Sequence, residues 1–167
     1  CSNLVEAHLP ASCELFDFCH FLACTSLKRV NLPENMTSLP DQIFEGCESL
    51  EEVVLPSGLK SIGASSFILC SSLKSIDFPR GVEVIGSNAF SGCTSLTEVS
   101  FPESMKTIYD NAFLGCDGLK EVVLPKNLEM LRELAFVMKI LPGLEVSAAK
   151  GPSALSGKAA ELAGMLP

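Results

Sequence analysis

A repeat of 23 residues runs without insertion through most of the 167-residue chain. Six consecutive copies share four identical positions: Cys at position 1, Leu at 4, Pro at 10 and Phe at 21. One copy cannot enclose a core of its own, whereas stacked copies can bury equivalent residues in ladders along a common axis. The repeat therefore predicts a solenoid with one elongated apolar core.

The repeat also predicts how the chain is divided. A six-unit solenoid is expected over 1–138, with units at 1–23, 24–46, 47–69, 70–92, 93–115 and 116–138.

The register fails after Phe136, and 139–167 form a region rich in Ala, Gly, Ser, Leu and Pro. Gly143 to Val146 read as a degenerate last strand. Leu155, Ala159 and Leu162 follow helical spacing. We expect 139–167 to be a degenerate C-terminal cap or tail with a short helix, with a linker or a docking segment as alternatives.

Within each unit, positions 4 to 10 read as a strand. In 50–56 the inward candidates Val53 and Leu55 are spaced at the strand period of two, and Pro56 ends the run because it has no N–H to donate. A second extended piece is expected near position 16, and a helical turn over 87–93, which begins with Ser and Asn. The expected fold class is an α/β repeat solenoid, with a parallel sheet on one face and short extended or helical turns on the other.

The pattern Cys-x-x-Leu-x-x-Val-x-Leu-Pro, followed by Ile-Gly and Ala-Phe-x-Gly-Cys, resembles the BspA-like class of leucine-rich repeats. Its clearest copies run from Cys70 to Cys93 and from Cys93 to Cys116, and the resemblance covers 1–138. That class includes surface and adhesion proteins of oral bacteria and of parasitic protists. The resemblance implies a leucine-rich-repeat fold and a protein-binding scaffold without shared catalytic residues.

The Cys and Phe positions are expected to form structural ladders rather than reactive sites. Equivalent side chains of a parallel stack lie about 4.8 Å apart, wider than the Cβ separation of about 3.8 Å in a disulfide, which favours buried free thiols. The Phe side chains are expected to form a core spine. Cys13 and Cys19 lie outside the ladder, and their pairing with each other or with Cys1 stays open. The ladders comprise Cys1, Cys24, Cys47, Cys70, Cys93 and Cys116, and Phe21, Phe44, Phe67, Phe90, Phe113 and Phe136.

Composition and motifs exclude several function classes. Twelve Lys and Arg against 20 Asp and Glu give a net charge of −8, which disfavours binding to nucleic acid. No apolar run reaches the roughly 18 residues of a transmembrane helix. Neither histidine, His8 or His20, has a nucleophilic partner at a recognised catalytic spacing, and no phosphate-binding or metal-ligating motif occurs. We therefore expect a non-enzyme without cofactor or metal.

The outward positions 5, 6 and 8 of the strands form the candidate site. Their charges are of mixed sign and are accompanied by exposed valines, which suits a protein partner better than a polyanion. The candidate partner-binding residues are Lys28, Arg29, Asn31, Glu51, Glu52, Val54, Lys74, Asp77, Glu98, Lys120, Glu121 and Val123.

The sequence thus predicts a non-catalytic protein-interaction module that uses the sheet face or the ends of the solenoid. One alternative is a structural accessory subunit of a larger, membrane-associated assembly, including an algal or protist organelle complex, which contacts the chain ends or 139–167. A second is a fragment of a surface adhesin. Because Cys1 is already position 1 of a full unit, we expect further sequence or a partner to cover that end. The compartment stays open between the cell surface and an organelle complex.

Overall fold

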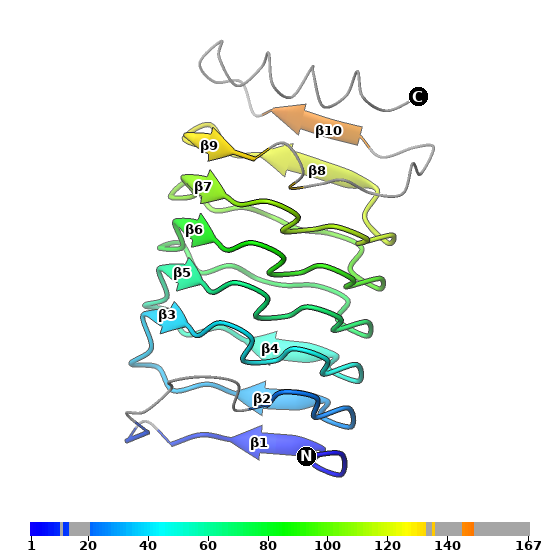
Figure 1. The fold of residues 1–167 in the computed structure, drawn as a ribbon. Helices are drawn as coiled ribbons and strands as arrows, with labels where there is room; N and C mark the ends of the chain where they lie inside the picture. Colours follow the sequence, from blue (N-terminus) through cyan, green and yellow to red (C-terminus); the bar gives the residue numbers. More distant parts are fainter. Residues whose placement is uncertain (11, 14–20, 133–134, 136–144, 149–167) are drawn as a thin grey trace.

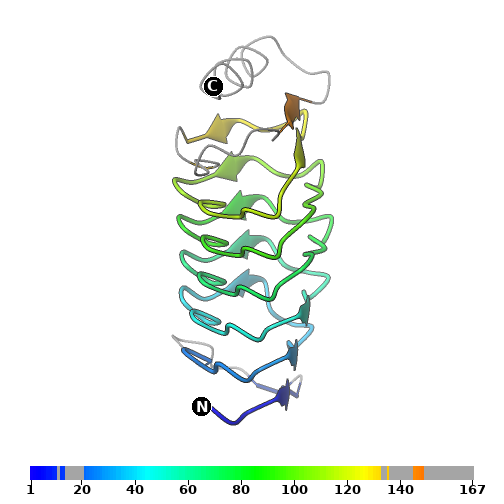
Figure 2. The ribbon, with the colours of Figure 1, turned by 90° about the vertical axis from the view of Figure 1, so that its right-hand side faces the viewer.

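The fold was analysed in a computed structural model of the chain, which describes residues 1–10, 12–13, 21–132, 135 and 145–148. Each 23-residue unit makes one coil, and successive coils lie one above another (Figure 1). Two sets of strands run up separate sides of the stack. The view turned by 90° shows the strands and turns of successive coils aligned along the same axis (Figure 2). The predicted solenoid of leucine-rich-repeat type with parallel sheets is confirmed.

The first sheet is formed by positions 6 to 8 of the units. Strands β1 (Glu6–His8), β2 (Arg29–Asn31) and β4 (Glu52–Val54) pair in parallel with a constant offset of one repeat. In each strand the middle residue turns inward and its two neighbours face out, so Val30 and Val53 are buried. At the far end of the stack, β8 (Glu121–Leu124) pairs with β10 (Glu145–Ala148).

The second sheet is continuous across five units. It is built from positions 15 and 16, where the inward residue is always a large aliphatic one and is buried. Its strands, in spatial order, are β3 (Ser38–Leu39), β5 (Ser61–Ile62), β6 (Val84–Ile85), β7 (Thr107–Ile108) and β9 (Met130–Leu131). The extended piece expected near position 16 is therefore a second parallel sheet.

The turn segments correct one prediction. The part of the chain that the structure describes contains no helix, and 87–93 form turns instead of the expected helical turn. Two residues of this segment, Asn88 and Gly92, have φ of 56° and 76°. Left-handed backbone interrupts the right-handed conformation that a helix must repeat. The α/β designation and the helical turns were therefore wrong.

The turns use their backbone groups between coils instead. The N–H groups of Phe44 and Gly46 donate to the carbonyls of Ser66 and Ile68 in the next unit, at 2.8 and 2.9 Å. In a helix these N–H groups would donate to carbonyls of the same segment and would not link neighbouring coils. The left-handed residues recur at positions 19 and 23 of the units, as Gln42, Ser65, Asn88 and Asn111, and as Ala23, Gly46, Leu69, Gly92 and Gly115.

The first sheet is interrupted in units 4 and 5. Asp77, Ser100 and Val123 are joined only by isolated bridges between neighbouring coils. The interruption coincides with a change at position 9, which is Leu in the units that form regular strands but Phe78 and Phe101 in these two. The two rings stack on each other at 5.8 Å and pack edge-on against the Phe spine. We infer that the larger rings take more room at the end of the strand and so disturb the regular pairing.

The core is a set of ladders along the axis. Phe44, Phe67, Phe90 and Phe113 are fully buried, and neighbouring rings in the spine stack at centroid distances of 5.0 to 5.3 Å. Phe21 continues the stack at 5.4 Å from Phe44. Offset stacking of this kind adds to the free energy gained by burying the rings.

Past unit 6 the repeat gains one residue. Glu145 pairs with Glu121, an offset of 145 − 121 = 24 residues instead of 23. Strand β10 therefore contains part of the expected degenerate strand at 143–146. Phe136, Gly143, Leu144 and the rest of the tail, including the helix expected around Leu155, lie outside the described residues.

Candidate protein-binding face

The predicted face lies on the outer side of the first sheet. Position 7 points into the core, so positions 6 and 8 on either side of it point to solvent. Eleven of the twelve predicted residues are exposed, and Glu51 is partly exposed. The strands of this sheet, β1, β2, β4, β8 and β10, lie along one side of the stack (Figure 1). One open surface therefore carries side chains from six units.

Two hollows divide this surface. Hollow 1, of about 400 Å³, lies over units 2 to 4 and includes Arg29, Glu52, Val54 and Lys74 in its lining. Hollow 2, of about 420 Å³, lies over units 4 to 6 and includes Glu98, Lys120, Glu121 and Val123. Ser75 and Asp77 line both, so the hollows adjoin. Ten of the twelve predicted residues line one or both, and only Lys28 and Asn31 lie outside them.

In units 1 to 3 the charges of the face neutralise one another. The Arg29 guanidinium lies 3.7 Å from a Glu6 carboxylate oxygen and 3.6 Å from one of Glu52. The Lys28 ammonium lies 3.6 Å from the Glu51 carboxylate. These pairs are solvent-exposed, so each contributes little to stability. Because of these ion pairs, the charged side chains of this half of the face already have partners of opposite charge.

In units 4 to 6 the same face carries charges without such matches. Among the residues that the structure describes, Lys74, Asp77, Glu98, Lys120 and Glu121 form no ion pair. Glu98 and Glu121 occupy position 6 of neighbouring coils. Two like charges on adjacent strands repel each other. In this half of the face, the charged side chains thus lack ion-pair partners among the described residues.

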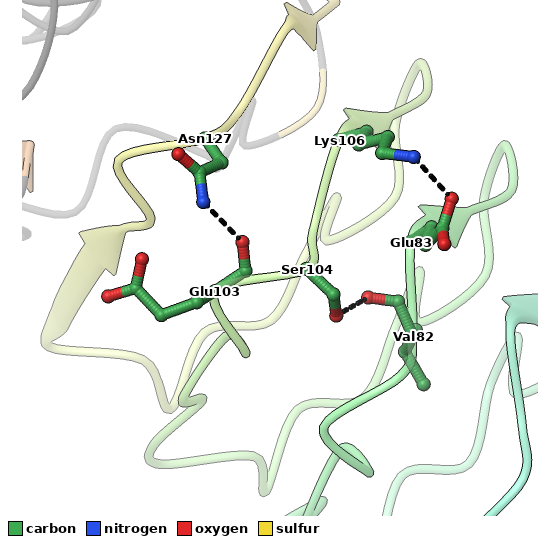
Figure 3. Close-up of polar contacts among 6 residues, drawn as sticks. All are labelled: Val82, Glu83, Glu103, Ser104, Lys106 and Asn127. Carbon is green, nitrogen blue, oxygen red and sulfur yellow. Dashed lines mark hydrogen bonds and ion pairs between the residues drawn. The ribbon is translucent and has the colours of Figure 1, made fainter.

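Beside the second sheet, at position 14 just before its strands, one pair of opposite charges is matched. The Lys106 ammonium donates to the Glu83 carboxylate at 2.7 Å (Figure 3). This hydrogen bond lowers the pKa of Glu83 and raises that of Lys106. Position 14 continues with Lys60 below this pair and Glu129 above it, so the charges alternate along the stack. Nearby, Ser104 donates to the Val82 carbonyl and Asn127 to that of Glu103, which ties the coils together.

The Cys ladder is structural in its geometry. The thiols of Cys47, Cys70, Cys93 and Cys116 each donate to a Phe carbonyl in an earlier coil, with Sγ–O distances of 3.0 to 3.2 Å. Burial raises the pKa of Cys47 and Cys116 to about 12, and raises that of Cys70 and Cys93 well above its ordinary value.

A neutral buried thiol is a poor nucleophile and a poor metal ligand. Cys1 and Cys13 are also free thiols, whereas Cys19 lies outside the described residues. Over the described ranges, no three His, Cys, Asp or Glu side chains converge in a group that could hold a metal ion. Within the same ranges, no helix has both the length and the apolar character needed to cross a membrane.

The candidate list omits three small residues of the outward positions that also line the hollows. Ser75, Thr97 and Ser100 are short and exposed. They stand where other units carry Arg29, Glu51 or Val54, so the local loss of large side chains opens the surface. The available signal was the coincidence of these small residues with Phe78 and Phe101 at position 9 of the same units.

Comparison with known proteins places this geometry in a family. A family model described as BspA type leucine rich repeat region (6 copies) matches residues 1–120. A search of curated proteins found no match.

Three solved structures illustrate the structural likeness. A leucine-rich repeat protein of T. pallidum is 30% identical with a TM-score of 0.71, over 95% of this chain and 83% of that one. One from Bacteroides ovatus is 28% identical with a TM-score of 0.65, over 88% of this chain and 46% of that one. A leucine rich cell surface protein of Faecalibacterium prausnitzii, 22% identical over 87% of this chain and 48% of that one, shares the fold with a TM-score of 0.60.

Proposed function

The chain belongs to the BspA-type leucine-rich-repeat family, and from this premise we propose that it is a non-catalytic module that binds a protein partner on the outer face of the first sheet. Proteins of this family mediate protein–protein interaction or adhesion. Solenoids in general present an extended face made of one short segment per repeat. The proposal assigns that role to the face that carries Val54 and Val123.

The observation that supports the proposal is the pair of adjoining hollows. They place exposed aliphatic side chains, Val54 and Val123, beside charged groups of both signs. A protein interface combines the same elements, an apolar centre and a polar rim. The second sheet offers a weaker candidate, because its Glu83 and Lys106 already satisfy each other.

Photocrosslinking tests the proposal directly. A photoreactive phenylalanine analogue replaces Val54 or Val123 on the first sheet, and Met130 on the second sheet serves as the matched exposed control. After irradiation in an extract of the source organism, mass spectrometry identifies the captured proteins. We expect one protein to be enriched at both Val positions and not at Met130.

A mutation checks that the capture is specific. Reversing Lys28, Arg29, Glu51 and Glu52 together preserves the total charge but inverts the pattern of the face in units 2 and 3. We expect the crosslinking yield at Val54 to fall while the folded signal in circular dichroism persists. Equal capture at Val54, Val123 and Met130 would falsify the proposal.

A further inference from the structure

We propose that the partner inserts an extended segment with the pattern aliphatic-x-Arg-x-aliphatic along the solenoid axis, across the face of units 3 to 6. This inference rests on the proposed function and deepens it, since it names the chemistry that the face recognises. The charges without ion-pair partners, the exposed valines and the short side chains that line the two hollows support it.

The first half of the face supplies a template for the missing charge. There, one guanidinium, that of Arg29, lies between the carboxylates of Glu6 and Glu52. In the second half, Glu98 and Glu121 stand at the same position of neighbouring coils, and the described residues provide no cation within ion-pair distance of either. An arginine from the partner would pair with Glu98 and Glu121 from above the sheet, whereas Arg29 pairs with Glu6 and Glu52 from the coil between them.

Arginine fits this place better than lysine. Its planar guanidinium presents donors along several edges and can contact two carboxylates at once, whereas an ammonium acts as a point charge. Asp77, one coil below Glu98, lines the same hollow and adds a third carboxylate to it. Binding also relieves the repulsion between neighbouring carboxylates.

Two exposed valines set the length of the segment. Val54 and Val123 both occupy position 8, and their exposed fractions are 54% and 45%. They are three coils apart, which corresponds to about 14 Å at the parallel-strand spacing. An extended chain advances about 3.3 Å per residue, so four residues cover about 13 Å.

The strand period then fixes the pattern. Side chains at the first, third and fifth residues of an extended segment point to the same side. Aliphatic side chains at the first and fifth residues therefore meet Val54 and Val123. The third residue, the arginine, lies level with units 4 and 5, which carry Asp77 and Glu98, and its long side chain extends toward Glu121 in the next coil.

The floor between the valines leaves room for this segment. Ser75 and Ser100 are short, and regular strand pairing is replaced by the bridges at Asp77 and Ser100. Hydroxyl groups and backbone groups that are not part of a continuous ladder can hydrogen-bond to a partner backbone.

A short synthetic peptide tests the inference. The probe is acetyl-Gly-Val-Ser-Arg-Ser-Val-Gly-amide, titrated to about 1 mM because a contact of this size is weak. We expect amide resonances of Val54, Ser75, Ser100 and Val123 to shift in a saturable manner, while those of the second sheet do not. No shift at these residues, or equal shifts on both sheets, overturns the proposal.

Variants of the peptide and of the protein supply the controls. Replacing the peptide arginine by glutamate, or removing the serine after it, should weaken binding at least about tenfold. The double variant Glu98→Lys with Glu121→Lys should bind the arginine peptide at least about tenfold more weakly than the unmodified protein does. It should bind the glutamate peptide more tightly than the arginine peptide. The variant Glu103→Lys with Glu129→Lys changes the net charge equally, lies away from the first sheet and should bind as the unmodified protein does.

The outcome separates this inference from the proposed function. If crosslinking is selective at Val54 and Val123 but the arginine peptide shifts no resonances, the recognition pattern is wrong and the proposed function stands. Response to the glutamate peptide as strong as to the arginine peptide also overturns it. Loss of selective crosslinking removes the proposed function itself.

Discussion

The two parallel sheets arise from the same repeat but differ in continuity and in how their charges are arranged. The second sheet pairs without a break from β3 to β9, and on it Glu83 and Lys106 satisfy each other. The first sheet pairs regularly at its two ends and is reduced to bridges in units 4 and 5, where Glu98 and Glu121 stand together. Each coil contributes to both sheets, so the difference cannot come from the overall fold.

The difference shows how a repeat can separate stability from recognition. Inward positions of both sheets keep apolar residues because the shared core requires them. Outward positions are free to vary, and on the first sheet units 4 to 6 carry charges without ion-pair partners among the described residues. We infer that the second sheet holds the stack together and that the first is available for a partner.

The largest expected effect compares two isoleucines of unit 4. Ile85→Ala, under the continuous second sheet, should lower the free energy of unfolding by about 3–5 kcal/mol. Ile76→Ala, under the interrupted first sheet, should cost about 2–3 kcal/mol, because the wall of the hollow can relax into the space. Urea denaturation measures both. Equal losses would contradict the view that the two sheets differ in rigidity.

The second prediction attempts to repair the interruption. Phe78→Leu together with Phe101→Leu gives units 4 and 5 the leucine found at position 9 of the regular units. Amide hydrogen exchange at Asp77 and Ser100 should slow as regular pairing extends across them. The loss of the ring contacts should still lower global stability by about 1–3 kcal/mol. Unchanged exchange would show that the rings do not cause the interruption.

The third prediction concerns a turn and should affect both sheets alike. Leu69 has φ of 62° at a position where three other units carry glycine. Leu69→Gly should raise the free energy of unfolding by about 1 kcal/mol, because glycine adopts left-handed backbone without steric cost. Thermal unfolding measures the change. The reverse substitution, Gly92→Leu, is the matched control and should destabilise, since its Cβ would lie 2.9 Å from the Leu69 side chain.

The smallest effect comes from the charges on the second sheet. In Lys106→Gln, Glu83 loses the partner that lowers its pKa, so the variant should be slightly less stable at neutral pH. A carboxylate with a lowered folded-state pKa stabilises above its unfolded pKa of 4.5, and that contribution disappears as the pH falls through the lowered value. Melting temperatures of the two proteins should therefore converge in acid and in high salt. A constant gap across pH would assign the difference to another cause.

Much of the fold could be predicted because the repeat constrains it so strongly. The period, the inward residues at positions 7, 9 and 16 and the parallel stacking follow from regular spacing alone. The helical turn over 87–93 was wrong for a reason of context. Ser87, Asn88 and Ala89 are compatible with a helix start, yet the neighbouring coils offer hydrogen-bond partners to Asn88 and Phe90 that a helix would leave unused.

The candidate site was predictable by position but not by shape. Alternation along the strand predicts that Val54 and Glu98 lie on the outer face. Hollows depend on the volumes of neighbouring side chains in different units, such as Ser75 beside Val54. The spacing of residues along the chain does not show which side chains of different units lie next to one another.

By itself, the sequence determined the number of coils with a shared period, their parallel stacking and the residues that enter the core, because burial of a periodic apolar set has only one regular solution. Tertiary structure alone decided which outward charges find a partner. Arg29 reaches Glu6 and Glu52 across coils, whereas Glu98 and Glu121, at the same position of neighbouring coils, form no ion pair with any described residue. Such contacts join residues 23 positions apart, and their energy depends on geometry between coils rather than on any local property of the chain.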